Sequence, residues 1–146
     1  MTPATSSGPP LIVDASVALK WLVDEPGSEA AHDLRHRDLA APALLRVETA
    51  NVMRTLAARG AISAPEALDL FRLLQSAPVK IVDHDDALES RALEIALDLG
   101  HPVYDCIYLS LAERMDRSLI TADRKFHRAP QATSFVKRAE LLDDGV

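Results

Sequence analysis

The stretch LITADRKF, residues 119–126, has the pattern of a buried strand that ends on an acid and is followed by two cations. Its first three residues are apolar or β-branched, which favours a strand of residues 119–121. Asp123 follows that run, and Arg124 and Lys125 come directly after it. A helix cap would explain the aspartate but not the cations. The arrangement raises the question of whether other strands of this chain also end on acids.

The stretch LIVDAS, residues 11–16, gives one answer, because a short apolar run of residues 11–13 ends on Asp14. Taken alone, Asp14 fits the N-cap of a following helix. Ser16, two residues later, is placed to hydrogen-bond the carboxylate and orient it. Thr121 offers a hydroxyl partner to Asp123 in a similar way. Both strand ends thus combine an aspartate with a nearby hydroxyl side chain.

Apolar runs of strand length alternate with helical patterns along the chain. The expected strands are residues 11–13, 39–42, 79–82 and 119–121, with a weaker one near Phe135 and Val136. Three of the expected helices cover residues 16–23, 86–99 and 104–115. Another begins near residue 28, and a further helix stops at the glycine at 60. The last begins at the capping box formed by Ser63 and Glu66. Such alternation implies parallel strands joined by helical crossovers, so the sequence predicts one α/β domain with a mainly parallel sheet.

The composition restricts the class of protein. The 146 residues fit a single domain, expected over residues 11–146, after a disordered lead-in of residues 1–10. One cysteine excludes an intrachain disulfide and a cysteine-based zinc cluster. No apolar run is long enough for a membrane span, and the first residues lack the pattern of a signal peptide, so no membrane contact and a cytoplasmic location are expected. The net charge of −6 argues against nucleic-acid binding through a broad basic face.

Two further acids lie where simple explanations are weak. Leu44, Glu48, Val52 and Leu56 are spaced by four, so the glutamate shares one helix face with apolar residues. An acid there is costly unless a cation or hydrogen-bond donors compensate it, and Asn51 adds a second polar group beside it.

Asp105 is the other such acid. It opens the segment YDCIYLSLAERM, where the helix dipole favours an acid but the neighbours are largely apolar. We interpret it as an acid that points inward from a buried helix end.

Four carboxylates would converge on one rim of a parallel sheet, because strand C-termini and the adjoining helix N-termini meet there. They would repel each other, and shared burial would raise their pKa values. A divalent cation removes that conflict. Oxygen ligands without a His or Cys cluster point to Mg²⁺ or Mn²⁺ rather than zinc.

These segments together resemble a known family. LIVDASV, Glu48 with Asn51, YDCIYLSLA and LITADRKF are similar to the PIN-domain ribonucleases, and within them to the VapC toxins of bacterial toxin–antitoxin pairs. The resemblance covers about residues 11–137. It implies a three-layer α/β/α fold and an acidic quartet, supported by hydroxyl and amide side chains. The implied quartet is Asp14, Glu48, Asp105 and Asp123, and the implied supporting residues are Ser16, Asn51 and Thr121.

The resemblance also implies an activity and partners. The implied reaction is metal-dependent hydrolysis of RNA phosphodiester bonds, with Arg124 and Lys125 beside the phosphate path. The implied partner is a small VapB-like antitoxin whose tail occupies the active site, and the implied assembly is a homodimer.

Three other classes of protein remain to be weighed. A phosphoacceptor receiver domain would need an acidic pair after the first strand, but Ala15 follows Asp14. A PIN-like nuclease could act on DNA, because the same metal site can cut either polymer. A non-catalytic module could use its acids only to dock a basic partner, and it would not degrade RNA when metal is added.

Overall fold

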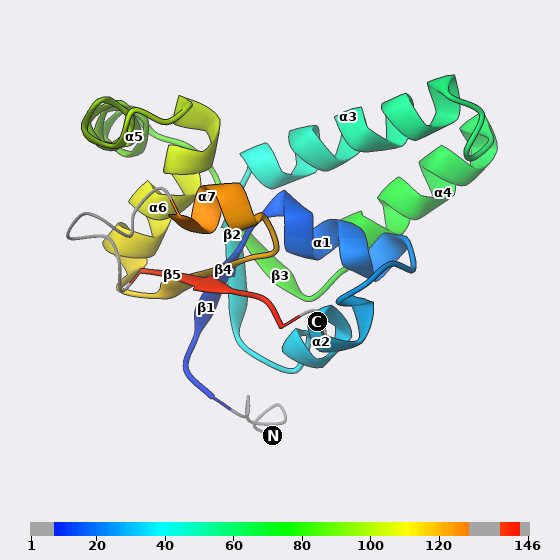
Figure 1. Cartoon of the computed structure of the whole chain (residues 1–146), viewed down its shortest axis with the longest axis horizontal. Helices are drawn as coiled ribbons and strands as arrows, with labels where there is room; N and C mark the ends of the chain where they lie inside the picture. Colours follow the sequence, from blue (N-terminus) through cyan, green and yellow to red (C-terminus); the bar gives the residue numbers. More distant parts are fainter. Residues whose placement is uncertain (1–7, 129–137, 144–146) are drawn as a thin grey trace.

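The computed structural model describes residues 8–128 and 138–143 of the chain. Figure 1 shows a central sheet with helices around it. The strands are β1 (Leu11–Val13), β2 (Leu39–Pro42), β3 (Val79–Val82), β4 (Ser118–Thr121) and β5 (Ala139–Leu141). The helices are α1 (Ala15–Leu22), α2 (Ser28–Leu34), α3 (Leu44–Ala58), α4 (Ala64–Gln75), α5 (Asp86–Leu99), α6 (Val103–Met115) and α7 (Arg124–Arg128).

The five strands form one sheet in the order β3-β2-β1-β4-β5, and all its recorded pairings are parallel. The strand order therefore reverses next to β1, because β2 lies on one side of it and β4 on the other. Val13 of β1 pairs in register with Ile120 of β4, so the carboxyl ends of the two strands lie side by side. A crevice at such a point is where open α/β sheets commonly bind their ligands.

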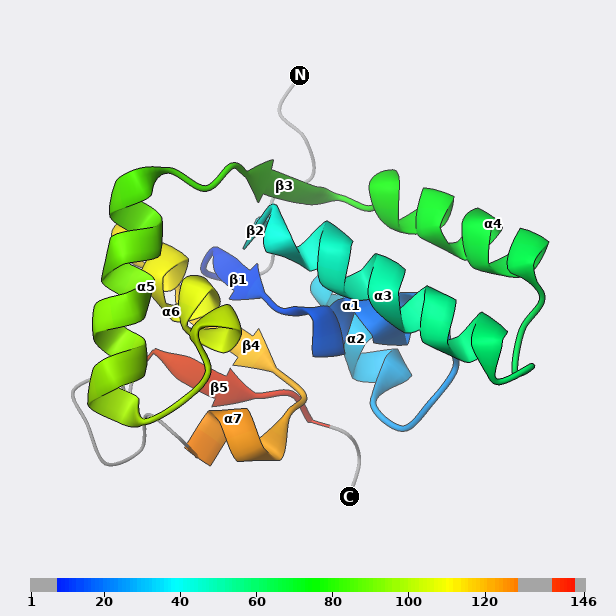
Figure 2. The same cartoon turned by 90° about the horizontal axis from the view of Figure 1, so that it is seen from above.

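The helices lie on both faces of this sheet. In Figure 2, α5 and α6 lie on one side, and α1 to α4 lie on the other. The helices α3 and α4 form a hairpin that extends well beyond the sheet. The expected three-layer α/β/α arrangement with a mainly parallel sheet is therefore confirmed.

The core is almost entirely aliphatic and is centred on β1, β4 and α6. All three residues of β1 are buried, and residues 106–112 of α6 form an unbroken buried run. A helix that is buried all round cannot show a polar face, which explains the continuous apolar pattern of this segment. Tyr108 and Phe126 are the largest fully buried side chains, and both lie close to the acids described below.

Local capping signals fix several helix ends. Ser63 and Glu66 form the expected capping box at the start of α4. Gly100 ends α5 with a φ of 63°, a left-handed conformation that glycine adopts without strain. The weak strand expected near Phe135 and Val136 lies outside the described residues, and the fifth described strand is β5, farther along the chain.

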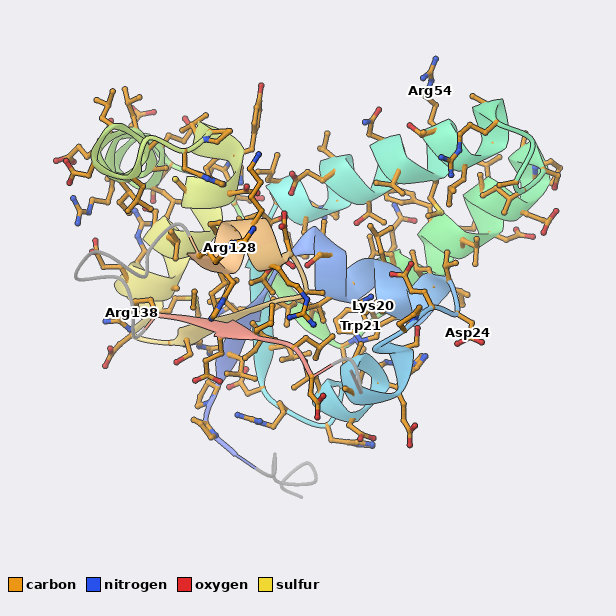
Figure 3. All side chains as sticks on the ribbon, viewed as in Figure 1. Lys20, Trp21, Asp24, Arg54, Arg128 and Arg138 are labelled. Carbon is orange, nitrogen blue, oxygen red and sulfur yellow. The ribbon has the colours of Figure 1, made fainter. Side chains whose placement is uncertain are left out.

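The short helix α2 is attached to α1 through a tryptophan. The indole Nε1 of Trp21 donates a 2.7 Å hydrogen bond to the carbonyl oxygen of Ala31 (Figure 3). The ring is half-buried and packs against the core. No helix in the described part of the chain is long and apolar enough to cross a membrane.

Candidate active site

Asp14 lies at the carboxyl end of β1 and caps the first turn of α1. Its Oδ1 accepts hydrogen bonds from the Ser16 hydroxyl at 2.5 Å and from the Val17 amide at 3.3 Å. The residue is 5% exposed, so this is a buried carboxylate and not an ordinary surface cap. Ser16 therefore makes the orienting contact that the sequence suggested.

The environment of Asp14 disfavours its charged form. Burial raises the pKa of this carboxyl group from 3.8 to about 6, and the charge of Asp105 adds to the increase. Hydrogen bonds from Ser16, Thr121 and the Val17 amide act in the opposite direction and keep the pKa from rising further. The recorded donors to Asp14 are neutral groups, namely the hydroxyls of Ser16 and Thr121 and the Val17 amide.

Ser16 also attaches Asp14 to the loop that follows β4. Its hydroxyl oxygen accepts a 2.8 Å hydrogen bond from the Ala122 amide and lies 3.3 Å from the Thr121 hydroxyl. Thr121 in turn accepts a 3.0 Å hydrogen bond from the backbone amide of Asp123. Thr121 was expected to pair with the Asp123 side chain, but its recorded contacts are with the Asp123 backbone and with the Ser16–Asp14 pair.

Glu48 lies on α3 and is half-buried, and its recorded partner is a tyrosine from another helix. The hydroxyl of Tyr108 donates a 2.5 Å hydrogen bond to Oε1 of Glu48. Burial raises the pKa of Glu48, the Tyr108 hydrogen bond lowers it, and the charge of Asp105 raises it again. Asn51, which was expected to support this acid, is exposed one turn farther along α3.

Asp105 lies in the first turn of α6 and contacts a histidine from the preceding loop. The Nε2 of His101 is 2.6 Å from Oδ2 of Asp105. The imidazole ring also stacks on Phe126 of α7, with ring centroids 5.3 Å apart and planes inclined by 23°. Sequence reasoning missed both His101 and Tyr108 as partners of the acids. The one available signal was the i,i+4 spacing of His101 and Asp105 around a helix start.

Asp123 is the most exposed of the four acids. Its Oδ1 accepts hydrogen bonds from the amides of Lys125 at 2.9 Å and Phe126 at 3.2 Å, so Asp123 caps α7. The side chains of Arg124 and Lys125 are exposed on the first turn of this helix. The loop between β4 and α7 thus carries the acid Asp123, and the first turn of α7 carries the two cations directly after it.

The acids influence one another without forming a closed cage. The charge of Asp105 raises the pKa values of both Asp14 and Glu48, which shows that these three lie within electrostatic reach. Among residues 8–128 and 138–143, no group of three or more His, Cys, Asp or Glu side chains forms a ready-made metal site. Mg²⁺ is commonly held by one or two carboxylates together with water and substrate phosphate. An open set of acids near the carboxyl ends of β1 and β4 is compatible with that kind of binding.

The family of this chain follows from comparison with known proteins. The model of the PIN domain matches residues 11–132, which includes all four acids. The chain therefore belongs to the PIN-domain family, in its group of VapC ribonucleases. Ribonuclease VapC3 from Pyrobaculum aerophilum is 33% identical over 124 residues, which cover 79% of this chain and 90% of that protein. Ribonuclease VapC9 from Mycobacterium tuberculosis is 33% identical over 125 residues, which cover 84% of this chain and 92% of that protein.

Solved structures show the same fold. One match is VapBC2 from Rickettsia felis, which was solved in complex with a DNA fragment from the VapBC2 promoter. The TM-score is 0.67 and the identity 14%, over 92% of this chain and 100% of that chain. VapC20 from Mycobacterium tuberculosis, described as a toxin that cleaves the sarcin–ricin loop, matches with a TM-score of 0.64 and 16% identity, over 82% of this chain and 94% of that one.

Proposed function

We propose that this protein is a VapC toxin, an endoribonuclease that hydrolyses RNA phosphodiester bonds. The observation that carries the proposal is Asp14, a buried carboxylate at the carboxyl end of β1 beside β4, with Glu48 and Asp105 within electrostatic reach. Keeping such a charge away from water is costly, so the arrangement favours a site that binds a cation. The VapC ribonucleases that the chain resembles support the choice of RNA as substrate.

We further propose that the cation is Mg²⁺ or Mn²⁺, held by Asp14, Asp105 and Asp123, with Glu48 holding a second ion or a coordinated water. These donors are all carboxylate oxygens, which are the ligands that both metals prefer. When bound, the metal would supply charge neutralisation for the phosphate and for the attacking water. Ser16 and Tyr108 would keep Asp14 and Glu48 in fixed orientations while the substrate binds. Asn51, exposed near Glu48, would contact the RNA or its water shell.

Arg124 and Lys125 are proposed to bind the phosphates that flank the scissile bond. They are exposed on the first turn of α7, next to the loop that is hydrogen-bonded to Ser16. Cations at this position would attract the RNA backbone to a chain whose net charge is −6.

The proposed partners are a VapB-like antitoxin and a second copy of this chain. The uncompensated acids would attract a basic side chain from an antitoxin tail. Three large hydrophobic side chains on α5 and α6 are solvent-exposed in the single chain, which supports a homodimer built on these helices. They are Leu93 at 53%, Leu97 at 74% and Tyr104 at 62% exposure. A cytoplasmic location is proposed because RNA and the antitoxin would be met there.

The direct test is cleavage of a labelled RNA by the purified, antitoxin-free chain. Cleavage is expected with Mg²⁺ or Mn²⁺, and EDTA should stop it. Asp14→Asn serves as the matched inactive control, since its amide keeps the size of the side chain but cannot act as an anionic ligand. DNA of the same sequence tests the choice of polymer. Full activity in excess chelator, or equal activity of Asp14→Asn, would reject the proposal.

A further inference from the structure

His101 occupies a short, rigid connection between α5 and α6. Gly100 takes a left-handed conformation before it, and Pro102, with a φ of −56°, follows it as the N-cap residue of α6. The amide of His101 donates a 3.2 Å hydrogen bond back to the carbonyl oxygen of Ala96. The backbone of His101 is thus fixed from both sides by helix ends, so the direction of its side chain is determined by the fold.

The imidazole ring is fixed by two contacts of different kinds. Its Nε2 lies 2.6 Å from Oδ2 of Asp105, and the side chain is only 12% exposed. An ionised carboxylate can only accept a hydrogen bond, so Nε2 is the donor. The ring also stacks on Phe126, which is fully buried and whose amide donates to Asp123. One side chain therefore connects the acid of α6 to α7, the helix that Asp123 caps.

We propose that His101 is a positioning residue for Asp105, an inference that rests on the proposed function because it takes Asp105 as a metal ligand. Its hydrogen bond occupies Oδ2 and holds the carboxylate in one rotamer, which leaves Oδ1 available for coordination. The Asp105 side chain is 32% exposed on the first turn of α6, so several rotamers would be open to it without this contact. Partners that hold a ligating carboxylate in this way contribute strongly to metal affinity.

A purely structural role for His101 is the competing explanation. The ring fills space between Asp105 and Phe126, so its loss would also loosen the packing of α7. The two roles differ in what a substitution should change. If the role is structural, any replacement that loosens the packing should lower the melting temperature, whether or not it can donate a hydrogen bond. If His101 positions Asp105, metal affinity should fall only when the replacement side chain cannot donate a hydrogen bond to Asp105.

His101→Gln and His101→Met separate these roles. Both replace the ring by an unbranched chain of similar length, but only the glutamine amide can donate to Asp105. Mn²⁺ affinity is measured by titration calorimetry on the full, antitoxin-free chain, together with melting temperature and the kcat for RNA cleavage. We expect Met to weaken Mn²⁺ binding roughly 10- to 100-fold and Gln to stay within about threefold of the parent. His36→Met, at an exposed position after α2, is the control and should bind as the parent does.

Each result decides the matter. Equal Mn²⁺ affinity of the parent, Gln and Met chains overturns the proposal, and so does an equal loss in Gln and Met, which would assign His101 to packing alone. If the Met variant does not fold, His101→Asn replaces it, because its shorter amide cannot reach Oδ2. If the parent chain binds no Mn²⁺ but still cleaves RNA, the metal-ligand roles of the proposed function are wrong. The measurement on the parent chain alone distinguishes this outcome from the results that concern His101.

Discussion

The hydroxyl of Tyr108 donates a 2.5 Å hydrogen bond to Oε1 of Glu48, although the two residues are 60 positions apart in the sequence. Tyr108 is 1% exposed, so its ring is part of the core while its hydroxyl reaches the acids. The carboxylate raises the pKa of the Tyr108 hydroxyl, with burial as the larger cause, so the proton stays on the tyrosine. The pair joins α6 to α3.

Tyr108→Phe should leave the fold intact but weaken the site. The half-buried Glu48 would lose its hydrogen-bond donor, and its pKa would rise further. Leaving such a group unsatisfied lowers the free energy of unfolding by about 1–3 kcal/mol. We expect a lower free energy of unfolding by denaturant and about tenfold slower RNA cleavage at limiting Mn²⁺. Tyr104→Phe, on the exposed side of the same helix, is the control. Unchanged cleavage and stability in Tyr108→Phe would show that the contact has no role in the site.

Asp14→Asn should abolish cleavage and yet raise the stability of the metal-free chain. The pKa of Asp14 is raised from 3.8 to about 6, so the folded state is favoured while the group is protonated, and this contribution is lost as the pH rises through 6. At neutral pH the charged form of Asp14 therefore lowers the free energy of unfolding by about 3 kcal/mol. The gain in the variant is this amount minus the cost of burying the new amide group. In EDTA the variant should melt higher than the parent at pH 7.5, and the gap should close toward pH 4. A lower melting temperature at pH 7.5 would mean that Asp14 is chiefly a structural cap.

The parts of this molecule that sequence reasoning predicted depend on local patterns. Residues within one turn of each other specify the strand ends before Asp14 and Asp123, the Ser63 capping box and the helix stop at the glycine at 60. The parallel sheet followed from their alternation with helices. Because the carboxyl ends of adjacent parallel strands meet, the convergence of two of the acids could be expected from the sequence pattern alone.

The parts that were missed depend on contacts between distant segments. Nothing near Tyr108 in the sequence indicates that it meets Glu48, because α3 and α6 are brought together only by the sheet between them. In the sequence His101 is only a residue between Gly100 and Pro102, and its contact with Phe126 is visible only in the folded chain. The strand β5 has little apolar signal of its own and exists through its pairing with β4, where Ala139 pairs in register with Leu119.

Asp85→Asn should destabilise the chain at neutral pH, but not in acid. Arg114 forms two 2.8 Å hydrogen bonds to the Asp85 carboxylate, and they are the main reason why its pKa is lowered to about 2. A lowered pKa stabilises the fold above about pH 4, and that contribution is lost as the pH falls toward 2. Asparagine keeps an oxygen for the Leu88 amide, so the variant retains the helix cap and loses the charge with one of the two Arg114 hydrogen bonds.

The melting temperatures of Asp85→Asn and of the parent should differ at pH 7, and the difference should shrink as the pH falls from about 4 toward 2. Asp69→Asn, which breaks an exposed ion pair with Arg72 within α4, should show a smaller difference at pH 7. A gap for Asp85→Asn that stays constant down to pH 3 would contradict the assignment of the effect to charge.

Arg124→Ala should weaken RNA cleavage mainly through substrate binding. Arg124 follows Asp123 in the sequence, and its side chain is exposed on the first turn of α7. Loss of a phosphate contact at this position should raise KM for the RNA and reduce the salt dependence of RNA binding. Arg72→Ala, on the exposed face of α4, is the matched loss of charge far from the acids. We expect about a 3- to 10-fold difference in kcat/KM between the two variants. Equal values would return Arg124 to an ordinary surface residue.

The toxin role predicts a growth phenotype that depends on the acids. Expression of the chain in bacteria should arrest growth, and co-expression of the small protein encoded beside it should restore growth, since an antitoxin tail with a basic side chain would neutralise the uncompensated Asp14, Glu48 and Asp105. The isolated complex should cleave RNA poorly until the antitoxin is removed. Asp14→Asn should be harmless in the same vector because it lacks the ligand charge, and it should still bind the antitoxin because Glu48 and Asp105 remain. Growth arrest by Asp14→Asn would show that toxicity arises from something other than RNA cleavage. If no complex with the small protein can be recovered, the antitoxin part of the proposal is wrong, although the nuclease part stands.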